Sequence, residues 1–441
     1  MNTYLGTSNA ITLARRRMSL GERIGHMFAR IRFQLGGALL VGVLAPIVAR
    51  NYFERFPDQL LHYQNSVLGT VAAVLIGYMM FRKVSALPGA GTFVNILPAF
   101  LTSYSIVMVT FFALRLGYSR TQFLMSFVLV LVWFYFFSAI KSAFVRPRYL
   151  LVSSEAVQPE QQIKGADWVV THDIACAMEN ADLPIVVDFS SAEITEEWER
   201  YLADQAISGR QVINSRHMLE SVQGRVTIRH LSENTFGHLA PDSIFAPAKR
   251  YLDLLSANLA LIALSPMLLT LGLLIKAESK GPAIFKQTRI GFRGEKFTMY
   301  KFRSMREKTP DELNQVDADI TKDDDDRITR LGRFLRKTRL DELPQIINII
   351  RGEMSWIGPR PETVTLSAWY EKEIPFYRYR HIVRPGITGW AQVKQGHVAG
   401  IGDVRTKLEY DFFYVKYFSL WTDILILVQS VRVVITGKGA R

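Results

Sequence analysis

The chain reads Leu340-Asp341-Glu342-Leu343-Pro344-Gln345 at the point from which its fold and its chemistry can both be inferred. Apolar residues then recur at positions 343, 346, 347 and 350, the spacing of one helix face. This spacing predicts a helix whose first turn holds Asp341 and Glu342 and tolerates Pro344. A helix N-terminus carries partial positive charge, which favours an ionised carboxylate and a bound phosphate. Helix capping is the other interpretation of such acids, but arginines before and after the pair favour catalysis.

Two further strings follow, Gly358-Pro359-Arg360-Pro361-Glu362 and Arg384-Pro385-Gly386-Ile387-Thr388-Gly389-Trp390-Ala391-Gln392-Val393. Pro359 and Pro361 restrict the backbone on both sides of Arg360. The second string has the proline and glycine spacing of a turn. Together with the carboxylate pair, these strings indicate a site that handles a phosphate group.

Composition limits the classes of protein to consider. The 441 residues predict two or three domains. Hydrophobic residues make up 49% of the chain and the formal net charge is +13, which indicates an anionic membrane face or an anionic substrate. We expect no nucleic acid partner, because the chain has no nucleic-acid motif and many of its basic residues flank apolar runs. The single cysteine, Cys176, excludes an internal disulfide framework and a cysteine-rich metal site.

The N-terminal third predicts a membrane region. Residues 1–32 are basic and are expected on the cytoplasmic side, without a removable signal peptide. Residues 33–145 contain four apolar runs, each near the ~20 residues that cross a bilayer. Buried core helices are the alternative, but so many apolar runs in so short a stretch disfavour it. The basic residues after the second and fourth runs favour both ends of this region inside the cell.

Residues 146–243 predict a small Rossmann-like α/β module. Short apolar runs at 149–152, 168–170, 185–187 and 211–213 look like buried strands, and helical stretches such as Thr195–Ala206 lie between them. Dinucleotide binding has no support, because no Gly-x-Gly-x-x-Gly follows the first strand. We expect a structural or regulatory module.

Residues 244–441 form the last predicted domain. An apolar run at 254–275 is long enough to span a membrane but carries Ser265-Pro266 at its middle, where proline removes a helix hydrogen bond. A kinked spanning helix is the general interpretation of that pattern. The strand-like pattern of residues 282–305 predicts a hairpin with its turn at Arg293-Gly294. The acidic run Asp323–Asp326 is interpreted as a solvated loop.

The strings quoted above, in this order, resemble those of the bacterial polyprenyl-phosphate sugar-1-phosphate transferases, over about residues 247–441. The resemblance implies a membrane α plus α/β protein: four transmembrane helices, the α/β module and a monotopic α+β catalytic domain. It also implies that residues 252–276 form a re-entrant helix, broken at Ser265 and Pro266, which returns to the cytoplasmic face. Lys249 and Arg250 would then lie among lipid headgroups.

The resemblance also assigns roles to the carboxylate pair. Asp341 would attack the phosphate next to the sugar of a UDP-sugar, releasing UMP and forming a covalent phosphosugar-aspartate. Polyprenyl phosphate, expected to be undecaprenyl phosphate, would then take the sugar-1-phosphate. Glu342 would bind Mg²⁺, a cation that suits oxygen ligands and phosphates.

Other positions match residues of the family that lie around the substrate. Arg336 and Arg360 are expected to contact phosphate, a task that suits the planar guanidinium. Weaker candidates for substrate binding are Lys301, Pro359, Pro361, Arg384, Thr388, Gln392 and Asp411. Solvation of a strand lysine is the alternative for Lys301, and the role of Asp411 stays open.

One loop departs from the family pattern. The chain reads Lys394-Gln395-Gly396-His397-Val398-Ala399-Gly400 where many relatives carry Asn-Gly-Arg, so the sugar is left open. We expect UDP-glucose as the donor for exopolysaccharide or capsule synthesis, with UDP-galactose as the alternative. His397 is interpreted as a loop residue rather than a catalyst.

Two rival functions remain at the level of the sequence. A transporter is disfavoured because the apolar runs carry almost no charge, and a transport path usually needs some. A membrane anchor that recruits polysaccharide enzymes leaves the three strings unexplained.

We therefore expect a multi-pass enzyme of the bacterial inner membrane, with its catalytic domain on the cytoplasmic face. Membrane lipid is an expected partner, and a homodimer is one option that the sequence leaves open.

Overall fold

The computed structural model describes residues 31–53, 60–85, 92–144, 146–152, 166–189, 194–226, 245–306, 327–395 and 401–436. The chain divides into two compact units, Met1–Gln223 and Gly224–Arg441. Residues 1–30 of the predicted basic segment, the acidic run Asp323–Asp326 and His397 lie outside the described residues.

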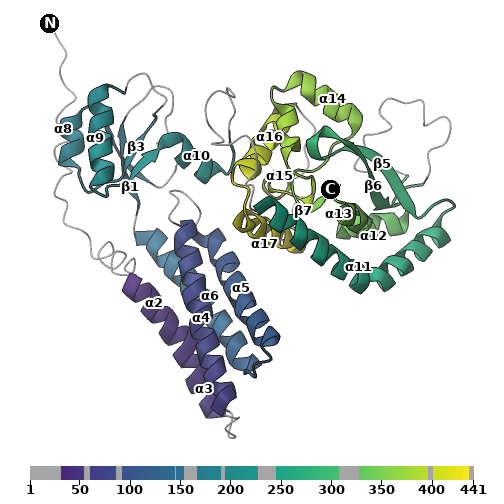
Figure 1. Cartoon of the computed structure of the whole chain (residues 1–441), viewed down its shortest axis with the longest axis horizontal. Helices are drawn as coiled ribbons and strands as arrows, with labels where there is room; N and C mark the ends of the chain where they lie inside the picture. Colours follow the sequence, from purple (N-terminus) through teal and green to yellow (C-terminus); the bar gives the residue numbers. More distant parts are fainter. Residues whose placement is uncertain are drawn as a thin grey trace. The chain divides into compact units, whose positions relative to one another are not determined.

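The four apolar runs of the first unit are helical, as predicted (Figure 1). The first run is divided by a short π-helical stretch, and the other three are continuous. Their elements are α2 (Ile31–Leu39), η2 (Leu40–Leu44), α3 (Ala45–Phe53), α4 (Leu60–Ser85), α5 (Thr92–Ala113) and α6 (Arg120–Phe144). Each run is long and apolar enough to cross a membrane.

Aromatic and small residues form the interior of this helical region. The Phe100 and Phe134 rings are fully buried, with centroids 4.6 Å apart. A hydrogen bond of 2.7 Å joins the hydroxyls of Tyr104 and Ser126 inside the bundle. In contrast, Phe112 is 87% exposed, although it is as apolar as the buried rings. A surface of exposed apolar side chains fits a lipid environment, since lipid replaces the buried core as the apolar partner.

The α/β module is a parallel sheet with strand order β2-β1-β3-β4. Its strands are β1 (Arg148–Val152), β2 (Asp167–Thr171), β3 (Ile185–Val187) and β4 (Val212–Asn214), and its helices are α8 (Ile174–Glu179), α9 (Glu196–Ile207) and α10 (Ser215–Gln223). Leu150 packs with Trp198 of α9, whereas the next residue, Leu151, packs with Met218 of α10. This alternation places helices on both faces of the sheet. The α/β module itself is as the sequence predicted.

The second unit is built mainly of helices around two small sheets. Strands β5 (Ile284–Ile290) and β6 (Lys296–Phe302) form the predicted hairpin, with the turn η3 (Phe292–Gly294). Strands β7 (Ser355–Ile357) and β8 (Gly386–Thr388) pair in parallel. The remaining elements are α11 (Phe245–Glu278), α12 (Arg330–Thr338), η6 (Leu340–Gln345), α13 (Ile346–Arg351), α14 (Val364–Glu373), η7 (Tyr377–Ile382), α15 (Trp390–Lys394), α16 (Ile401–Lys416) and α17 (Leu420–Thr436).

The helix α11 bends at its middle (Figure 1), where Pro266 is found. A proline in a helix leaves the carbonyl four residues earlier without its backbone donor. That carbonyl belongs to Ile262, and the Ser265 hydroxyl donates to it at 2.8 Å. The Ser-Pro pair therefore bends the helix and compensates for the lost hydrogen bond within the same turn.

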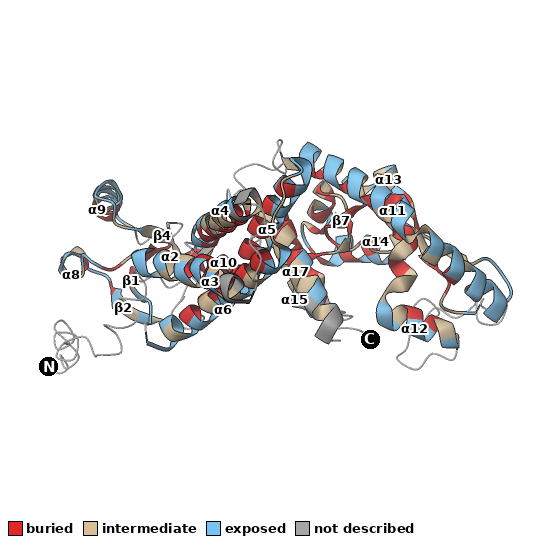
Figure 2. Cartoon of the chain, turned by 90° about the horizontal axis from the view of Figure 1, so that it is seen from below, coloured by how far each residue is buried: buried red, intermediate tan, exposed pale blue. Residues whose placement is uncertain are grey.

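One side of α11 packs against the rest of the second unit and the other is exposed (Figure 2). Ala257 is buried with Ile346 and Ile349 of α13, and Leu271 is buried with Leu335 of α12. The apolar residues that face away from the unit are Leu252, Leu255, Leu259, Ile262, Leu269, Leu273 and Leu274. Such a division predicts contact with lipid along the exposed side.

The single helix predicted from position 341 is wrong in detail. Arg339 adopts a left-handed conformation with φ of 57°, which ends α12, and a 3₁₀ turn then carries the chain from Leu340 to Gln345. The α-helix begins only at Ile346 and ends at Arg351. Of the predicted apolar face, Ile346 is buried and Leu343 and Ile350 are partly buried. Ile347 is 38% exposed instead, and Ile349, outside that face, is fully buried.

A short segment at the start of the second unit belongs to its core. Val226 is fully buried with Tyr370, Leu408 and Phe412, and its N–H donates to the carbonyl of Glu409 at 3.0 Å. The carbonyl of Gly224 accepts a 2.6 Å hydrogen bond from the Trp390 indole. The predicted domain start at residue 244 leaves this segment out.

Candidate active site

The hairpin and the 3₁₀ turn bring a lysine and the two carboxylates together. Strand β6 packs against η6, and Lys301 Nζ lies 3.1 Å from Glu342 Oε1. The neighbouring Asn348 fixes this arrangement, because its side chain accepts from the Tyr300 N–H at 3.1 Å and donates to the Thr298 carbonyl at 2.6 Å. Lys301 is therefore held beside the carboxylate pair rather than being merely solvated.

Arg360 reaches the same carboxylate from the loop after β7. Its Nη2 donates to Glu342 Oε1 at 2.7 Å. Glu342 thus pairs with two cations through one oxygen, and its side chain is only 8% exposed. A carboxylate in such a place is a bridge that sets the positions of both cations.

The two carboxyl groups have different electrostatic environments. Burial alone would raise the pKa of Glu342, but the charges and hydrogen bonds of Arg360 and Lys301 outweigh it and hold this pKa well below its usual range. For Asp341, burial and the adjacent Glu342 charge raise the pKa above its usual range. The charges of Lys301, Arg360 and Arg336 oppose that rise. The pair therefore combines a firmly ionised glutamate with a more basic, more nucleophilic aspartate.

Arg336 lies in the last turn of α12, half-buried, and its charge acts on Asp341. The structure thus brings together Asp341, Glu342, Lys301, Arg336 and Arg360, although they come from four separate segments. Three cations around two carboxylates suit a site that must bind the negatively charged oxygens of a diphosphate.

The donor atoms at this site fit Mg²⁺. Within the described residues, no three His, Cys, Asp or Glu side chains lie close enough to hold a metal ion by themselves. Mg²⁺ commonly binds one or two carboxylates and completes its coordination with substrate phosphates and water. The adjacent Asp341 and Glu342, of which Glu342 is kept ionised, meet this requirement.

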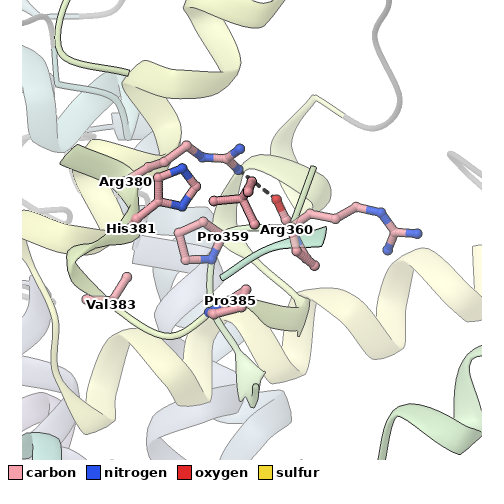
Figure 3. A pocket seen from close by; sticks show the side chains of 8 residues that line it. Pro359, Arg360, Arg380, His381, Val383 and Pro385 are labelled. Carbon is pink, nitrogen blue, oxygen red and sulfur yellow. Dashed lines mark hydrogen bonds between the residues drawn. The ribbon is translucent and has the colours of Figure 1, made fainter. Parts of the chain in front are cut away.

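The prolines beside Arg360 line a small pocket together with Arg380 and His381 (Figure 3). Its empty volume is about 170 Å³, too little for a UDP-sugar. The Arg360 guanidinium extends away from this pocket, while its carbonyl faces Arg380 (Figure 3). Pro359 and Pro361 therefore shape the backbone that presents Arg360 and do not themselves form a substrate cavity.

Three of the predicted substrate-binding residues hydrogen-bond within the protein. Arg384 Nε donates to the Gly352 carbonyl at 3.0 Å, and its guanidinium lies over the Phe292 ring. Thr388 shares a 2.7 Å hydrogen bond with Ser430, and Gln392 Nε2 donates to the Ile387 carbonyl at 3.3 Å. The contacts of these three side chains join β8 and its flanks to neighbouring elements, and none of them is to the carboxylate pair.

Asp411 lies in α16 and is almost fully buried. Its carboxylate pairs with Arg380 at 2.8 Å, and both side chains are 2% exposed. The predicted role in substrate binding does not agree with this burial. Sequence reasoning also missed Arg380 as a candidate, since nothing in Tyr377-Arg378-Tyr379-Arg380-His381 indicates which arginine points inward.

Lys249 and Arg250, which were expected among lipid headgroups, both bond to groups within the second unit. Lys249 is 7% exposed and pairs with Asp423 at 2.6 Å and with Asp253 at 3.8 Å. Arg250 donates to the carbonyls of Ile349 and Ile350 at the end of α13, at 2.6 and 2.9 Å. Carbonyls at a helix end and buried carboxylates attract these cations inward.

The family described as bacterial sugar transferase matches residues 244–437. The chain is 40% identical over 434 residues to the UDP-N-acetylgalactosamine-undecaprenyl-phosphate N-acetylgalactosaminephosphotransferase of Aeromonas hydrophila, covering 96% of this chain and 100% of that protein.

Other relatives match less than half of the chain. A UDP-glucose:undecaprenyl-phosphate glucose-1-phosphate transferase of Xanthomonas campestris pv. campestris is 43% identical over 206 residues, covering 46% of this chain and 42% of that protein. The protein of the same name in Escherichia coli strain K12 is 41% identical, covering 44% of this chain and 41% of that protein.

Proposed function

The chain belongs to the bacterial sugar transferase family, in the large form with N-terminal apolar helices, and from this premise we propose how its residues carry out the reaction. It is a membrane enzyme that transfers a sugar-1-phosphate from a UDP-sugar to undecaprenyl phosphate. The observation that carries the proposal is the convergence of Lys301 and Arg360 on Glu342, beside Asp341.

Asp341 acts as the nucleophile. One of its carboxylate oxygens attacks the phosphorus next to the sugar, the bond from that phosphorus to the bridging oxygen breaks, and UMP leaves with the bond electrons. An oxygen of undecaprenyl phosphate then attacks the same phosphorus and displaces the Asp341 carboxylate. Burial of Asp341 supports this role, because a raised pKa makes the ionised carboxylate a better nucleophile.

Lys301, Arg336 and Arg360 bind the oxygens on which negative charge resides during both transfers. Glu342 keeps Lys301 and Arg360 in place and would hold Mg²⁺. The metal would neutralise diphosphate charge when bound.

The donor sugar is proposed to be N-acetylgalactosamine. Support comes from the relative named for UDP-N-acetylgalactosamine, which matches this chain across both units. The UDP-glucose transferases match less than half of this chain, so UDP-glucose, the donor expected from the sequence, is the second candidate. The determinant of this choice is expected in the loop of residues 394–400.

The catalytic unit is proposed to lie on the cytoplasmic face, where UDP-sugars are made. Exposed Arg82 and Lys83 at the end of α4, and Lys141 at the end of α6, support this orientation. The bend of α11 at Pro266 and its exposed apolar side support a re-entrant helix.

A donor panel tests the function. The purified protein receives undecaprenyl phosphate, Mg²⁺ and one of UDP-N-acetylgalactosamine, UDP-glucose or UDP-galactose, and UMP release is measured. The proposal expects fastest release with UDP-N-acetylgalactosamine and a lipid-linked product of the same sugar. Preference for UDP-glucose would select the second candidate, and no release from any donor would contradict the function.

A further inference from the structure

The loop that presents Arg360 is held through four consecutive carbonyls. The Pro359 carbonyl accepts from the Gly386 N–H at 3.0 Å, and the Glu362 carbonyl accepts from the Ile290 N–H at 3.0 Å. Between them, the carbonyl of Arg360 accepts from Arg380 Nη2 at 2.8 Å, and the carbonyl of Pro361 accepts from Arg289 Nη1 at 3.1 Å. Two of the four donors are thus arginine side chains from elements distant in sequence.

Arg380 is the donor that holds Arg360 itself. Its guanidinium is 2% exposed and also donates to the Tyr377 hydroxyl at 2.7 Å, which places it against the Tyr377 ring. Asp411 pairs with the same Nη2 atom at 2.8 Å. Arg380 is therefore fixed from two sides, and its contact with the loop is to the backbone of the residue that reaches Glu342.

A second ion pair anchors the end of the same loop. Lys407, also in α16, donates to Glu362 Oε1 at 2.6 Å. Lys407 and Asp411 lie one helical turn apart, so α16 contributes both groups from one face. The helix α16 thus serves as the rigid support on which the Arg360 loop rests.

Burial separates this network from any substrate. Arg380 and Asp411 are each 2% exposed, whereas the side chains of Lys301 and Arg360 remain 17% and 18% exposed at the site. Figure 3 shows the Arg360 guanidinium pointing away from Arg380, so the two arginine head groups do not share a ligand.

We propose that Arg380, fixed by Asp411, is a positioning residue that acts on phosphoryl transfer through the backbone of Arg360. This inference rests on the proposed function of Arg360. It gives Asp411 a role at a distance from the substrate, in place of the substrate contact expected from the sequence. Displacement of a catalytic group by about 1 Å can cost roughly 10²-fold in rate, so loss of this support should lower kcat.

A double-mutant cycle in UMP release tests the inference. The variants are Arg380→Met, Arg360→Met and both together, with Arg378→Met as the matched control because Arg378 lies in the same turn with a side chain 75% exposed. Arg380→Met should lower kcat roughly 10²-fold and leave KM for the donor nearly unchanged. In the Arg360→Met background it should cause little further loss, since its effect passes through Arg360.

Loss of Arg380 alone leaves Asp411 buried and unpaired, which can prevent folding. The variant Arg380→Met with Asp411→Leu removes both charges, and Arg380→Lys keeps one charge that can reach the Arg360 carbonyl. The variant Arg380→Met with Asp411→Leu should unfold near the wild-type temperature and still have a low kcat. Arg380→Lys should recover part of the wild-type kcat.

If the losses of kcat in Arg380→Met and Arg360→Met multiply in the variant that carries both, the inference is overturned. Full activity in a folded variant without Arg380 would overturn it as well. A rise in KM at constant kcat would point to substrate contact and contradict it equally. A wild-type protein that releases no UMP would instead contradict the proposed function and the inference with it.

Discussion

Arg360 Nη2 lies 2.7 Å from Glu342 Oε1, and this contact joins two strings that are 18 positions apart in the sequence. The same oxygen accepts from Lys301 of the hairpin. The geometry of the cationic site therefore depends on Glu342. By holding Lys301 and Arg360, Glu342 also keeps these two cations close to Asp341.

Replacement of that bridge should disable the site. Glu342→Gln leaves Lys301 and Arg360 near an amide without the charge that holds them, and we expect kcat/KM to fall roughly 10²–10³-fold, as when a preorganised charge contact is lost. UMP release measures the effect. The exposed Glu373→Gln serves as control, and a Glu342→Gln enzyme with more than half of wild-type activity would contradict the bridge.

Lys301 should set the alkaline limit of activity. Burial and the Arg360 charge lower the pKa of Lys301 below the ordinary 10.5, although Glu342 and Asp341 oppose this. The charge that binds phosphate is present below this lowered pKa and is lost as the pH rises through it. The alkaline decline of kcat/KM should therefore start below the range of an ordinary lysine.

Lys301→Arg keeps its charge at higher pH, so it should move that decline upward. The matched control is Lys296→Arg, an exposed position on the same strand. An unchanged pH profile in Lys301→Arg would exclude Lys301 as the titrating group.

Lys249 should stabilise the fold rather than bind lipid. Lys249→Met leaves Asp423, which also accepts from Tyr414 at 2.9 Å, without its buried cation. We expect a loss of roughly 3–5 kcal/mol in the free energy of unfolding, measured by thermal or denaturant unfolding in detergent. Lys276→Met, at the exposed far end of α11, should cost little. Weaker vesicle binding by a fully stable Lys249→Met protein would restore the headgroup role.

Val226 should stabilise the catalytic unit, although it lies before residues 244–437, which match the family. It is fully buried, so Val226→Ala removes two methyl groups from the core and should lower the stability of this unit by about 2 kcal/mol. Thermal unfolding of the whole protein reports the change. Val431→Ala, at a position 53% exposed, should leave the unfolding temperature near wild type. Equal effects of the two substitutions would show that residues 224–226 do not belong to the core.

Both ends of α11 should face the same side of the membrane. In a Cys176→Ser background, Ala248→Cys and Lys280→Cys place single thiols at exposed positions near the two ends. A membrane-impermeant thiol reagent should label both in inverted vesicles and neither in sealed cells. Labelling from opposite sides would mean that α11 spans the bilayer.

The length and order of the apolar runs were enough to predict most elements. Short apolar runs between helical stretches predicted the α/β module, and long runs predicted the four N-terminal helices. The start of α13 was not predictable in this way, because it depends on the left-handed Arg339, a conformation that arginine rarely adopts.

The charged residues around Asp341 and Glu342 were predictable from the sequence strings. The residues that hold the Arg360 loop in place were not. Arg380, Arg289 and Lys407 act through contacts to residues 360–362 that lie 20, 72 and 45 positions away. Lys249 was misplaced for the same reason, since its partner Asp423 is 174 positions away. Such pairings depend on tertiary packing, which periodicity does not report.

The central claim is that Asp341 carries the phosphosugar. The most direct measurement incubates the protein with Mg²⁺ and UDP-N-acetylgalactosamine labelled at the phosphate next to the sugar, without undecaprenyl phosphate, and follows label on the denatured protein. The account predicts labelled wild type, loss of the label when undecaprenyl phosphate is added, and no label on Asp341→Asn. UMP release and lipid product from Asp341→Asn at the wild-type rate would contradict it.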